Sequence, residues 1–131
     1  MRLSLTAAAG DVAILAAFPF LGAASHEDGV TAASFVRIVV PFVVGWAIVG
    51  LPASAYTQAT VGSLGRTLRI VPASWLAAGS IAMAIRIWGF DRPFVLAFSL
   101  VAVGVMGGLL IGWRLLLAVA SARTAERGGR A

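Results

Sequence analysis

Residues 93–122, PFVLAFSLVAVGVMGGLLIGWRLLLAVASA, contain a single charged side chain, Arg114. A helix needs about 20 predominantly apolar residues to cross a hydrocarbon core of about 30 Å. This stretch meets that requirement, so we interpret it as a transmembrane helix. The same criterion predicts three further spans closer to the N-terminus, at residues 5–24, 34–54 and 72–89.

The composition of the whole chain agrees with a membrane location. Hydrophobic residues make up 60% of the 131 residues and charged residues only 11%, whereas soluble domains average about 45–50% and about 25%. A chain this short buries too little surface to hide that excess from water. We therefore predict an all-α, polytopic membrane four-helix bundle in one domain, residues 1–122, followed by a basic disordered tail at 123–131.

The N-terminal segment has two interpretations. Its charged start and the small residues at 23–25 resemble a cleavable signal peptide. Asp11 interrupts the apolar core that such a peptide needs, and Pro19 lies close to the supposed cleavage site. We therefore expect a first transmembrane helix here.

All positive charges are arginines, and they flank the apolar segments instead of forming a nucleic-acid-binding stripe. One side of the predicted bundle receives Arg2, Arg66, Arg69, Arg114, Arg123, Arg127 and Arg130. The other receives Arg37, Arg86 and Arg92 together with the acids Glu27, Asp28 and Asp91. The positive-inside rule then places both termini in the cytoplasm, and we expect a multi-pass protein of the prokaryotic cell (inner) membrane.

Small residues at helical spacing predict how the spans pack. Gly104, Gly108 and Gly112 share one face of the fourth span, and Ser74, Ala78 and Ala82 share one face of the third. Such faces allow helices to approach closely in lipid, so we expect these two spans to form a tight antiparallel hairpin. The alternative is that glycine is simply frequent in membrane helices. The pattern does not distinguish packing within one chain from packing between copies.

Pro19 and Pro41 lie inside the first two spans, where each removes an amide donor and should kink its helix. Such kinks serve either as functional hinges or only to shape the bundle.

Asp11 is the most informative side chain, because a charge several residues inside a span is costly without a partner. Arg114 lies at a matching depth in the predicted topology, so an Asp11–Arg114 pair would join the first and last helices. Asp11 is alternatively a solvated residue of the first helical turns, or a proton- or solute-handling group.

The opposite side of the bundle holds a second set of polar candidates. Arg37 and Arg86 lie about one turn inside their spans, near His26 in the first connection. Both arginines can extend outward to the interface. Turned inward, they would form an anion-attracting vestibule in which His26 titrates near neutral pH.

Several kinds of chemistry lack the residues they need. The chain has no cysteine and one histidine, so thiolate and multi-histidine metal sites are excluded. No P-loop, GxSxG or strand-associated GxGxxG motif is present. We expect no enzymatic activity, no cofactor, no metal and no nucleic-acid partner.

A series of short motifs resembles one known family. Gly10-Asp11 opens the first span, Pro41-Phe42 and Gly45-Trp46 follow in the second, and Gly112-Trp113-Arg114 closes the series. Ser25-His26, Arg86 and the pair Phe94 and Phe98 lie between them. These motifs are similar to those of the prokaryotic four-helix membrane proteins catalogued as domain of unknown function 3054. The resemblance implies four spans and brings no activity with it.

Two functions remain open from the sequence. The first is a homo-oligomeric transporter or channel for a small polar or anionic solute, with a path between copies. The second is a non-catalytic accessory or assembly subunit of a larger membrane complex. They differ in where Asp11 and Arg86 point. Side chains that face a water-filled cavity would favour transport. Side chains that form ion pairs or hydrogen bonds within the protein would favour a structural role.

Overall fold

The computed structural model of the protein describes residues 4–23 and 29–129. Its regular elements in those ranges are α1 (Leu5–Ala23), α2 (Ala32–Gly50), α3 (Gln58–Val61), α4 (Leu64–Gly89) and α5 (Leu96–Gly128). All except α3 are long and apolar enough to cross a membrane. The predicted all-α, four-span membrane fold is therefore confirmed.

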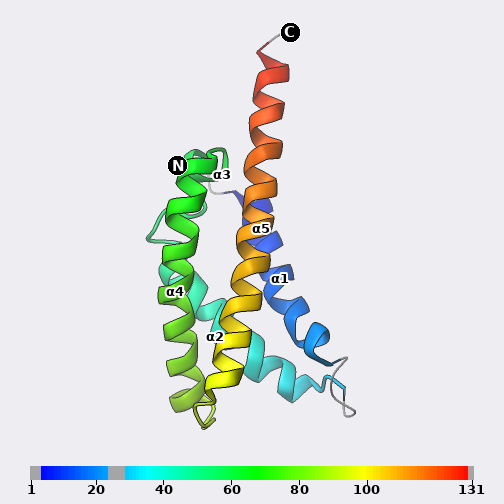
Figure 1. The fold of residues 1–131 in the computed structure, drawn as a ribbon, viewed down its shortest axis with the longest axis vertical. Coiled ribbons are helices and arrows are strands. Elements are labelled where there is room, and N and C mark those ends of the chain that lie inside the picture. The colour runs from blue at the N-terminus through cyan, green and yellow to red at the C-terminus, as the bar shows by residue number, and fades with distance from the viewer. Residues whose placement is uncertain (1–3, 24–28, 130–131) are drawn as a thin grey trace.

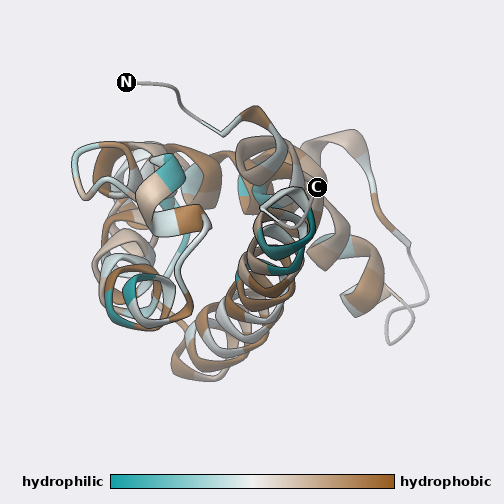
Figure 2. Ribbon diagram, turned by 90° about the horizontal axis from the view of Figure 1, so that it is seen from above, coloured by the Kyte–Doolittle hydropathy of each residue, from teal (hydrophilic) through white to brown (hydrophobic). Residues whose placement is uncertain are grey.

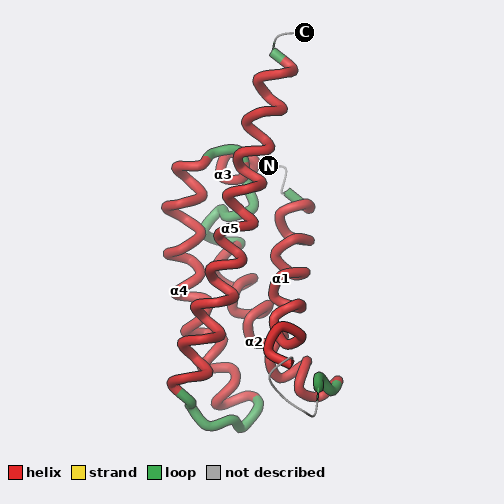
Figure 3. Tube along the Cα trace, turned by 45° about the vertical axis from the view of Figure 1, so that its right-hand side comes forward, coloured by secondary structure: helices red, strands yellow, loops and turns green. Residues whose placement is uncertain are grey.

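The long helices alternate in direction through the bundle. Figure 1 shows that α1 begins and α5 ends at the end of the bundle where α3 lies, while the α4–α5 connection lies at the opposite end. Figure 3 shows the same arrangement from another side, with the loops gathered at the two ends. We call these the α3 end and the hairpin end. In the view along the bundle, apolar residues cover most of the helices (Figure 2), as lipid surroundings require.

The helices differ in length, which places their ends at different depths. With 19 residues each, α1 and α2 are about 28 Å long at 1.5 Å per residue, close to the thickness of a hydrocarbon core of about 30 Å. With 26 and 33 residues, α4 and α5 reach about 39 and about 50 Å. Both lengths exceed that thickness, and α5 projects past the other helices at the α3 end (Figure 1).

Local hydrogen bonds set where the helices begin. The Thr31 hydroxyl accepts from the Ser34 amide at 3.1 Å, and the Ser34 hydroxyl accepts from the Thr31 amide at 3.0 Å. This reciprocal capping box satisfies two amides that have no partner within the helix. Ser63 caps α4 by accepting from the Arg66 amide at 3.4 Å.

The predicted boundaries differ from the structure most at the start of α4 and at the end of α5. Pro72 was expected to start the third span, but α4 begins at Leu64 and includes Pro72, because Ser63 supplies an earlier cap. The tail at 123–131 was expected to be disordered, yet α5 continues to Gly128. Alanine, arginine and glutamate in this stretch are strong helix formers, and they extend a helix that is already nucleated.

The most extensive helix pair is α2 with α4. Gly45 faces α4 so closely that a Cβ built on it would lie 2.5 Å from the Ala78 carbonyl oxygen. Phe42, Trp46 and Trp75 fill the interior beside this contact, with the Phe42 and Trp75 rings stacked at 5.8 Å. Ala78 and Ala82 are buried, and both lie against Gly45 of α2, a contact that the expected pairing with the fourth span did not include.

The contact between α4 and α5 uses a different glycine from those expected. A Cβ built on Gly107 would lie 2.4 Å from Trp75 Nε1, and this indole donates to the Val103 carbonyl at 2.8 Å. By contrast, a Cβ on Gly104, Gly108 or Gly112 would meet no atom within 4 Å. The close α4–α5 contact thus forms at Gly107, which receives the Trp75 ring, whereas Gly104 and Gly108 line an open groove between the same two helices.

Candidate functional site

The polar centre of the molecule is an ion pair between the first and last helices. Arg114 on α5 donates from Nε to Asp11 Oδ1 at 2.8 Å and from Nη2 to Asp11 Oδ2 at 2.5 Å. Asp11 is 0% exposed and Arg114 is 2% exposed. Two parallel bonds of this kind match the planar guanidinium to the carboxylate and fix their relative orientation.

Two further groups complete what we call the Asp11 cluster. Trp46 Nε1 on α2 donates to Asp11 Oδ2 at 2.9 Å. Arg114 Nη1 donates to the Ala55 carbonyl at 2.7 Å, in the connection between α2 and α3. The cluster therefore joins α1, α2, α5 and the following loop through hydrogen bonds that offset the desolvation of both charges.

Tyr56 covers the cluster from the loop side. Its ring lies 4.6 Å from Arg114 Cζ, a distance suited to a cation–π contact. The Ser4 amide donates to the Tyr56 carbonyl at 2.8 Å, which ties the start of α1 to the loop. Burial, and next the nearby Asp11 carboxylate, raise the pKa of the Tyr56 hydroxyl well above its usual range. The hydroxyl therefore stays neutral next to the ion pair.

Close packing next to the cluster brings α1 and α5 together. A Cβ built on Gly10 would lie 2.2 Å from the Trp113 ring, so only glycine admits that indole. The Trp113 Nε1 atom is buried and has no hydrogen-bond partner within the described ranges. Two neighbouring residues of α1 thus meet two neighbouring residues of α5. Gly10 packs against Trp113, and Asp11 forms the ion pair with Arg114.

At the hairpin end, Arg86 meets a different kind of partner. Arg86 Nη1 donates to the Arg37 carbonyl at 2.8 Å, and its Cζ lies 4.1 Å from the Phe98 ring centroid. In a regular helix the Arg37 carbonyl would accept from the amide four residues later. That residue is Pro41, which has no amide hydrogen. Arg86 therefore supplies the hydrogen bond that Pro41 removes.

The other candidates from the sequence are separated from these contacts. The Arg37 side chain is exposed, and His26 lies outside the described residues. Pro19 and Pro41 are both buried inside helices. Within residues 4–23 and 29–129, no group of three or more histidine, aspartate or glutamate side chains is placed to hold a metal ion.

Sequence reasoning missed the role of Trp46. It is the tryptophan that lies away from the predicted span ends, and an indole N–H in mid-membrane needs an acceptor. The sequence could therefore have predicted a hydrogen bond from Trp46 to Asp11, since Asp11 is the only acid within the predicted spans. The contacts of Arg114 with the Ala55 carbonyl and with Tyr56 could not be predicted in the same way, because no local sequence pattern gives the direction of a loop backbone.

Chemically, the Asp11 cluster is a neutralised pair in a site closed to solvent. Both Asp11 oxygens and three Arg114 nitrogens are engaged in hydrogen bonds. Such an arrangement fixes helices relative to one another, and breaking it by removing one charge is costly.

Comparison with known proteins identifies the family. Residues 8–117 match the family described as Protein of unknown function (DUF3054). No curated protein and no solved structure gave a match. The matched range contains both members of the ion pair, both proline kinks and Arg86. Because the match spans most of the chain, this four-helix membrane protein belongs to the DUF3054 family.

Proposed function

We propose that this chain is a non-catalytic subunit that assembles with a second membrane protein, and that the glycine face of α5 is its contact. The observation that carries the proposal is the internal pairing of the buried charges. Asp11 and Arg114 neutralise each other at 0% and 2% exposure. Charged groups that line a solute pathway, within one chain or between copies, face water instead.

Arg86 supports the same conclusion at the hairpin end. Its guanidinium turns toward α2 and the Phe98 ring, where it completes the backbone hydrogen bonding around Pro41. Both deep arginines thus have structural partners, which is the arrangement that favours an assembly role over transport.

The glycine face of α5, defined as Gly104, Gly108 and Gly112, offers room for another helix. A side chain added at any of the three would meet no atom of this chain within 4 Å. Gly104 and Gly108 themselves line a groove of about 260 Å³ between α4 and α5, together with residues that include Pro72 and Leu76. In lipid, small residues at this spacing allow a neighbouring helix to approach closely and gain packing contacts.

The arginine distribution supports an orientation for the subunit. Arg66, Arg69, Arg123 and Arg127 all belong to the α3 end of the bundle. The positive-inside rule then places the α3 end, with both termini, in the cytoplasm of a prokaryotic cell with the bundle in its inner membrane.

The test is native mass spectrometry of the protein extracted gently from its own membrane. We expect a second membrane protein in fixed ratio with the wild-type chain. The variant Gly104→Leu/Gly108→Leu should lose that protein while remaining folded, because both positions face open space. The matched control is Ala73→Leu/Ala77→Leu, an equally spaced pair of exposed small residues on α4, which should retain the partner.

Two results would overturn the assembly proposal. Rings or dimers of this chain alone, combined with solute flux in vesicles that depends on Asp11 or Arg86, would establish the homo-oligomeric transporter instead. Equal loss of the partner in the α4 control would show that the glycine face is not the contact.

A further inference from the structure

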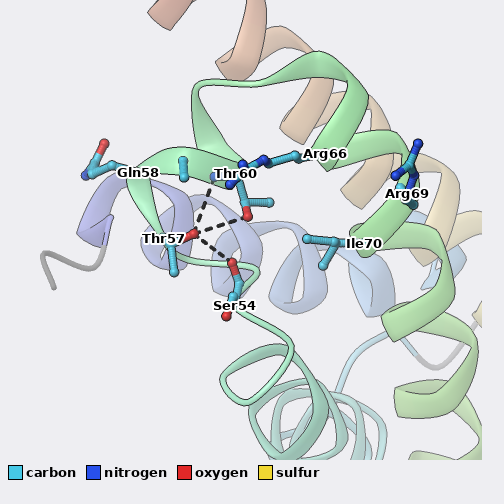
Figure 4. Close-up of a pocket in the computed structure, with 8 residues that line it drawn as sticks. Ser54, Thr57, Gln58, Thr60, Arg66, Arg69 and Ile70 are labelled. Carbon is cyan, nitrogen blue, oxygen red and sulfur yellow. Dashed lines mark hydrogen bonds between the residues drawn. The ribbon is translucent and has the colours of Figure 1, made fainter.

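A second polar site lies at the α3 end, outside the Asp11 cluster. Figure 4 shows a pocket of about 530 Å³ between the loop after α2, the short helix α3 and the first turns of α4. Its polar lining comes from Ser54, Thr57, Gln58, Thr60, Arg66 and Arg69. We call this the α3 pocket.

The charge of the α3 pocket is uncompensated. Arg66 and Arg69 lie one turn apart on α4 and both line the pocket. Neither side chain forms a hydrogen bond or an ion pair with any described residue, and no acidic residue lines the pocket. Figure 4 shows Arg66 reaching toward Thr60 on one side of the pocket and Arg69 farther along α4 on the other side. Guanidinium groups without an acidic partner attract an anion, and their planar donors match phosphate oxygens in particular.

The floor of the α3 pocket is rigid. The Thr57 hydroxyl lies 3.1 Å from both the Ser54 carbonyl and the Thr60 hydroxyl, and it accepts from the Thr60 amide at 3.3 Å (Figure 4). Thr67 on α4 donates to the Thr60 carbonyl at 2.9 Å and so fixes α3 against α4. The loop and α4 therefore hold their relative positions.

Two features of α4 are typical of a segment that reaches the lipid headgroups. With 26 residues, α4 is about 39 Å long and exceeds a hydrocarbon core of about 30 Å, so an untilted α4 extends into the headgroup region. Leu64 and Leu68 are 48% and 51% exposed on the same turns that carry the two arginines. Exposed leucines beside arginines are typical of a segment at the membrane surface.

We propose that the α3 pocket binds the phosphate group of an anionic ligand, through Arg66 and Arg69. An anionic phospholipid and a free phosphate compound carry the same recognised group. The site is independent of the assembly proposal, because it uses none of the glycine-face residues and none of the Asp11 cluster.

The experiment measures ligand binding to the purified full chain in detergent by thermal shift and native mass spectrometry. The probes are phosphatidylglycerol, phosphatidylcholine and inorganic phosphate. Phosphatidylglycerol should stabilise the wild type more than phosphatidylcholine, whose choline cation opposes the two guanidinium groups. Arg66→Gln/Arg69→Gln should weaken phosphatidylglycerol binding by about tenfold or more, as expected for the loss of charge-assisted hydrogen bonds.

The matched control is Arg123→Gln/Arg127→Gln, which removes two exposed arginines from α5 at the α3 end. It makes the same change in net charge and should bind phosphatidylglycerol like the wild type. Arg66→Lys/Arg69→Lys keeps the charge and should bind with intermediate affinity, which guards against a folding defect in the glutamine variant. Binding of inorganic phosphate that competes with the lipid would assign the site to free phosphate compounds as well.

The proposal is overturned by either of two results. Equal loss of binding in the α5 control would mean that phosphatidylglycerol responds to net charge and not to the α3 pocket. No difference between wild type and the Arg66/Arg69 variants with any probe would remove the site altogether. Neither result bears on the subunit contact, which is tested through α5.

Discussion

At the scale of single residues, the two buried charges need partners that replace the water they lose. Asp11 finds three donor atoms, from Arg114 Nε, Arg114 Nη2 and Trp46 Nε1. Arg114 in turn reaches the Ala55 carbonyl. The pair is therefore stable as a unit, while either member alone would be an uncompensated charge in a site without water.

That dependence predicts a strong non-additivity. Asp11→Asn and Arg114→Gln should each lower the free energy of unfolding in detergent by about 3–5 kcal/mol, the range for breaking a buried pair. The double variant should cost clearly less than the sum, because the second change removes the charge that the first left unpaired. Chemical denaturation of the four proteins measures the cycle. If the two single effects simply add, the Asp11–Arg114 contact contributes nothing to stability. The control is the exposed Arg123→Gln, which should change the free energy of unfolding by less than about 0.5 kcal/mol.

Tyr56 gives a pH prediction with a clear spectroscopic signal, since it is the only tyrosine in the chain. Its pKa is raised in the folded state, first by burial and then by the Asp11 carboxylate. Above an unfolded pKa of about 10, the unfolded chain binds fewer protons than the folded one, so stability falls as pH rises. Tyrosinate absorbance should appear at higher pH in the folded protein than in denaturant. Coincident titrations would contradict the burial of the hydroxyl.

In Tyr56→Phe the alkaline loss of stability should be smaller, because the group that ionises only on unfolding is absent. The ring and its contact with Arg114 are retained in this variant, so stability near neutral pH should change little. A matching decline in wild type and variant would assign the alkaline loss to other groups.

At the scale of helices, a proline in α2 is linked to an arginine in α4. Pro41 leaves the Arg37 carbonyl without its helical donor, and Arg86 Nη1 occupies that place at 2.8 Å. A missing backbone bond is expensive in lipid, so the proline and the arginine are coupled energetically although they lie on different helices.

We predict that Arg86→Met destabilises the wild type by about 1–3 kcal/mol, the cost of a backbone acceptor left without a donor within the bundle. In a Pro41→Ala background the cost should be smaller, because the restored amide at position 41 can donate to the Arg37 carbonyl. Thermal or chemical unfolding of the four proteins gives the coupling energy. The matched control is Pro19→Ala, a proline in α1, in which Arg86→Met should cost as much as in the wild type. An undiminished cost in the Pro41→Ala background would refute the link.

The helix contacts also explain why spacing alone misled the packing prediction. Gly104, Gly108 and Gly112 have the spacing that permits close approach, but the α4–α5 contact forms at Gly107, where the Trp75 indole needs room. Adjacent residues on a helix point about 100° apart, so the rotation of α5 about its axis decides whether Gly107 or Gly108 meets α4. The rotation follows from the size of Trp75, which the glycine pattern does not contain.

At the scale of the whole molecule, the bundle has two chemically different ends. The α3 end carries the Asp11 cluster, the α3 pocket and the basic extension of α5, whereas the hairpin end carries Arg86 and the short α4–α5 connection. The proposed partner contact lies between them, along the glycine face. The three regions use separate residues, so each can be altered without disturbing the others.

The proposed orientation is tested by cysteine labelling, for which the natural absence of cysteine is an advantage. Asp91→Cys, at the hairpin end, should react with a membrane-impermeant maleimide in intact cells. Ala125→Cys, near the end of α5, should react only after the membrane is permeabilised, because the positive-inside rule places this end in the cytoplasm. The reverse labelling pattern would invert the topology, and labelling of both sites in intact cells would indicate mixed insertion.

The four-span fold and the candidate ion pair could be derived from the sequence because both follow from local properties. A span is recognised from the length and polarity of one segment, and a charge inside it demands a partner at the same depth. Asp11 and Arg114 satisfied both conditions once the spans were assigned. The exact helix ends were less accessible, because Ser63 and the helix-forming residues after Ala122 extend α4 and α5 beyond their apolar cores.

The remaining features depend on how helices rotate and cross, and only the tertiary structure decided them. The sequence contains Pro41 and Arg86 but nothing in their spacing joins them, since they meet through the packing of α2 on α4. The packing of α1 on α2 brings Trp46 to Asp11. The position of the loop after α2 against α4 brings Ser54, Arg66 and Arg69 to the lining of one pocket. Hydropathy determines which segments enter the membrane, because transfer into lipid acts on each segment separately. Side-chain shape determines which faces meet, because packing acts on all the helices together.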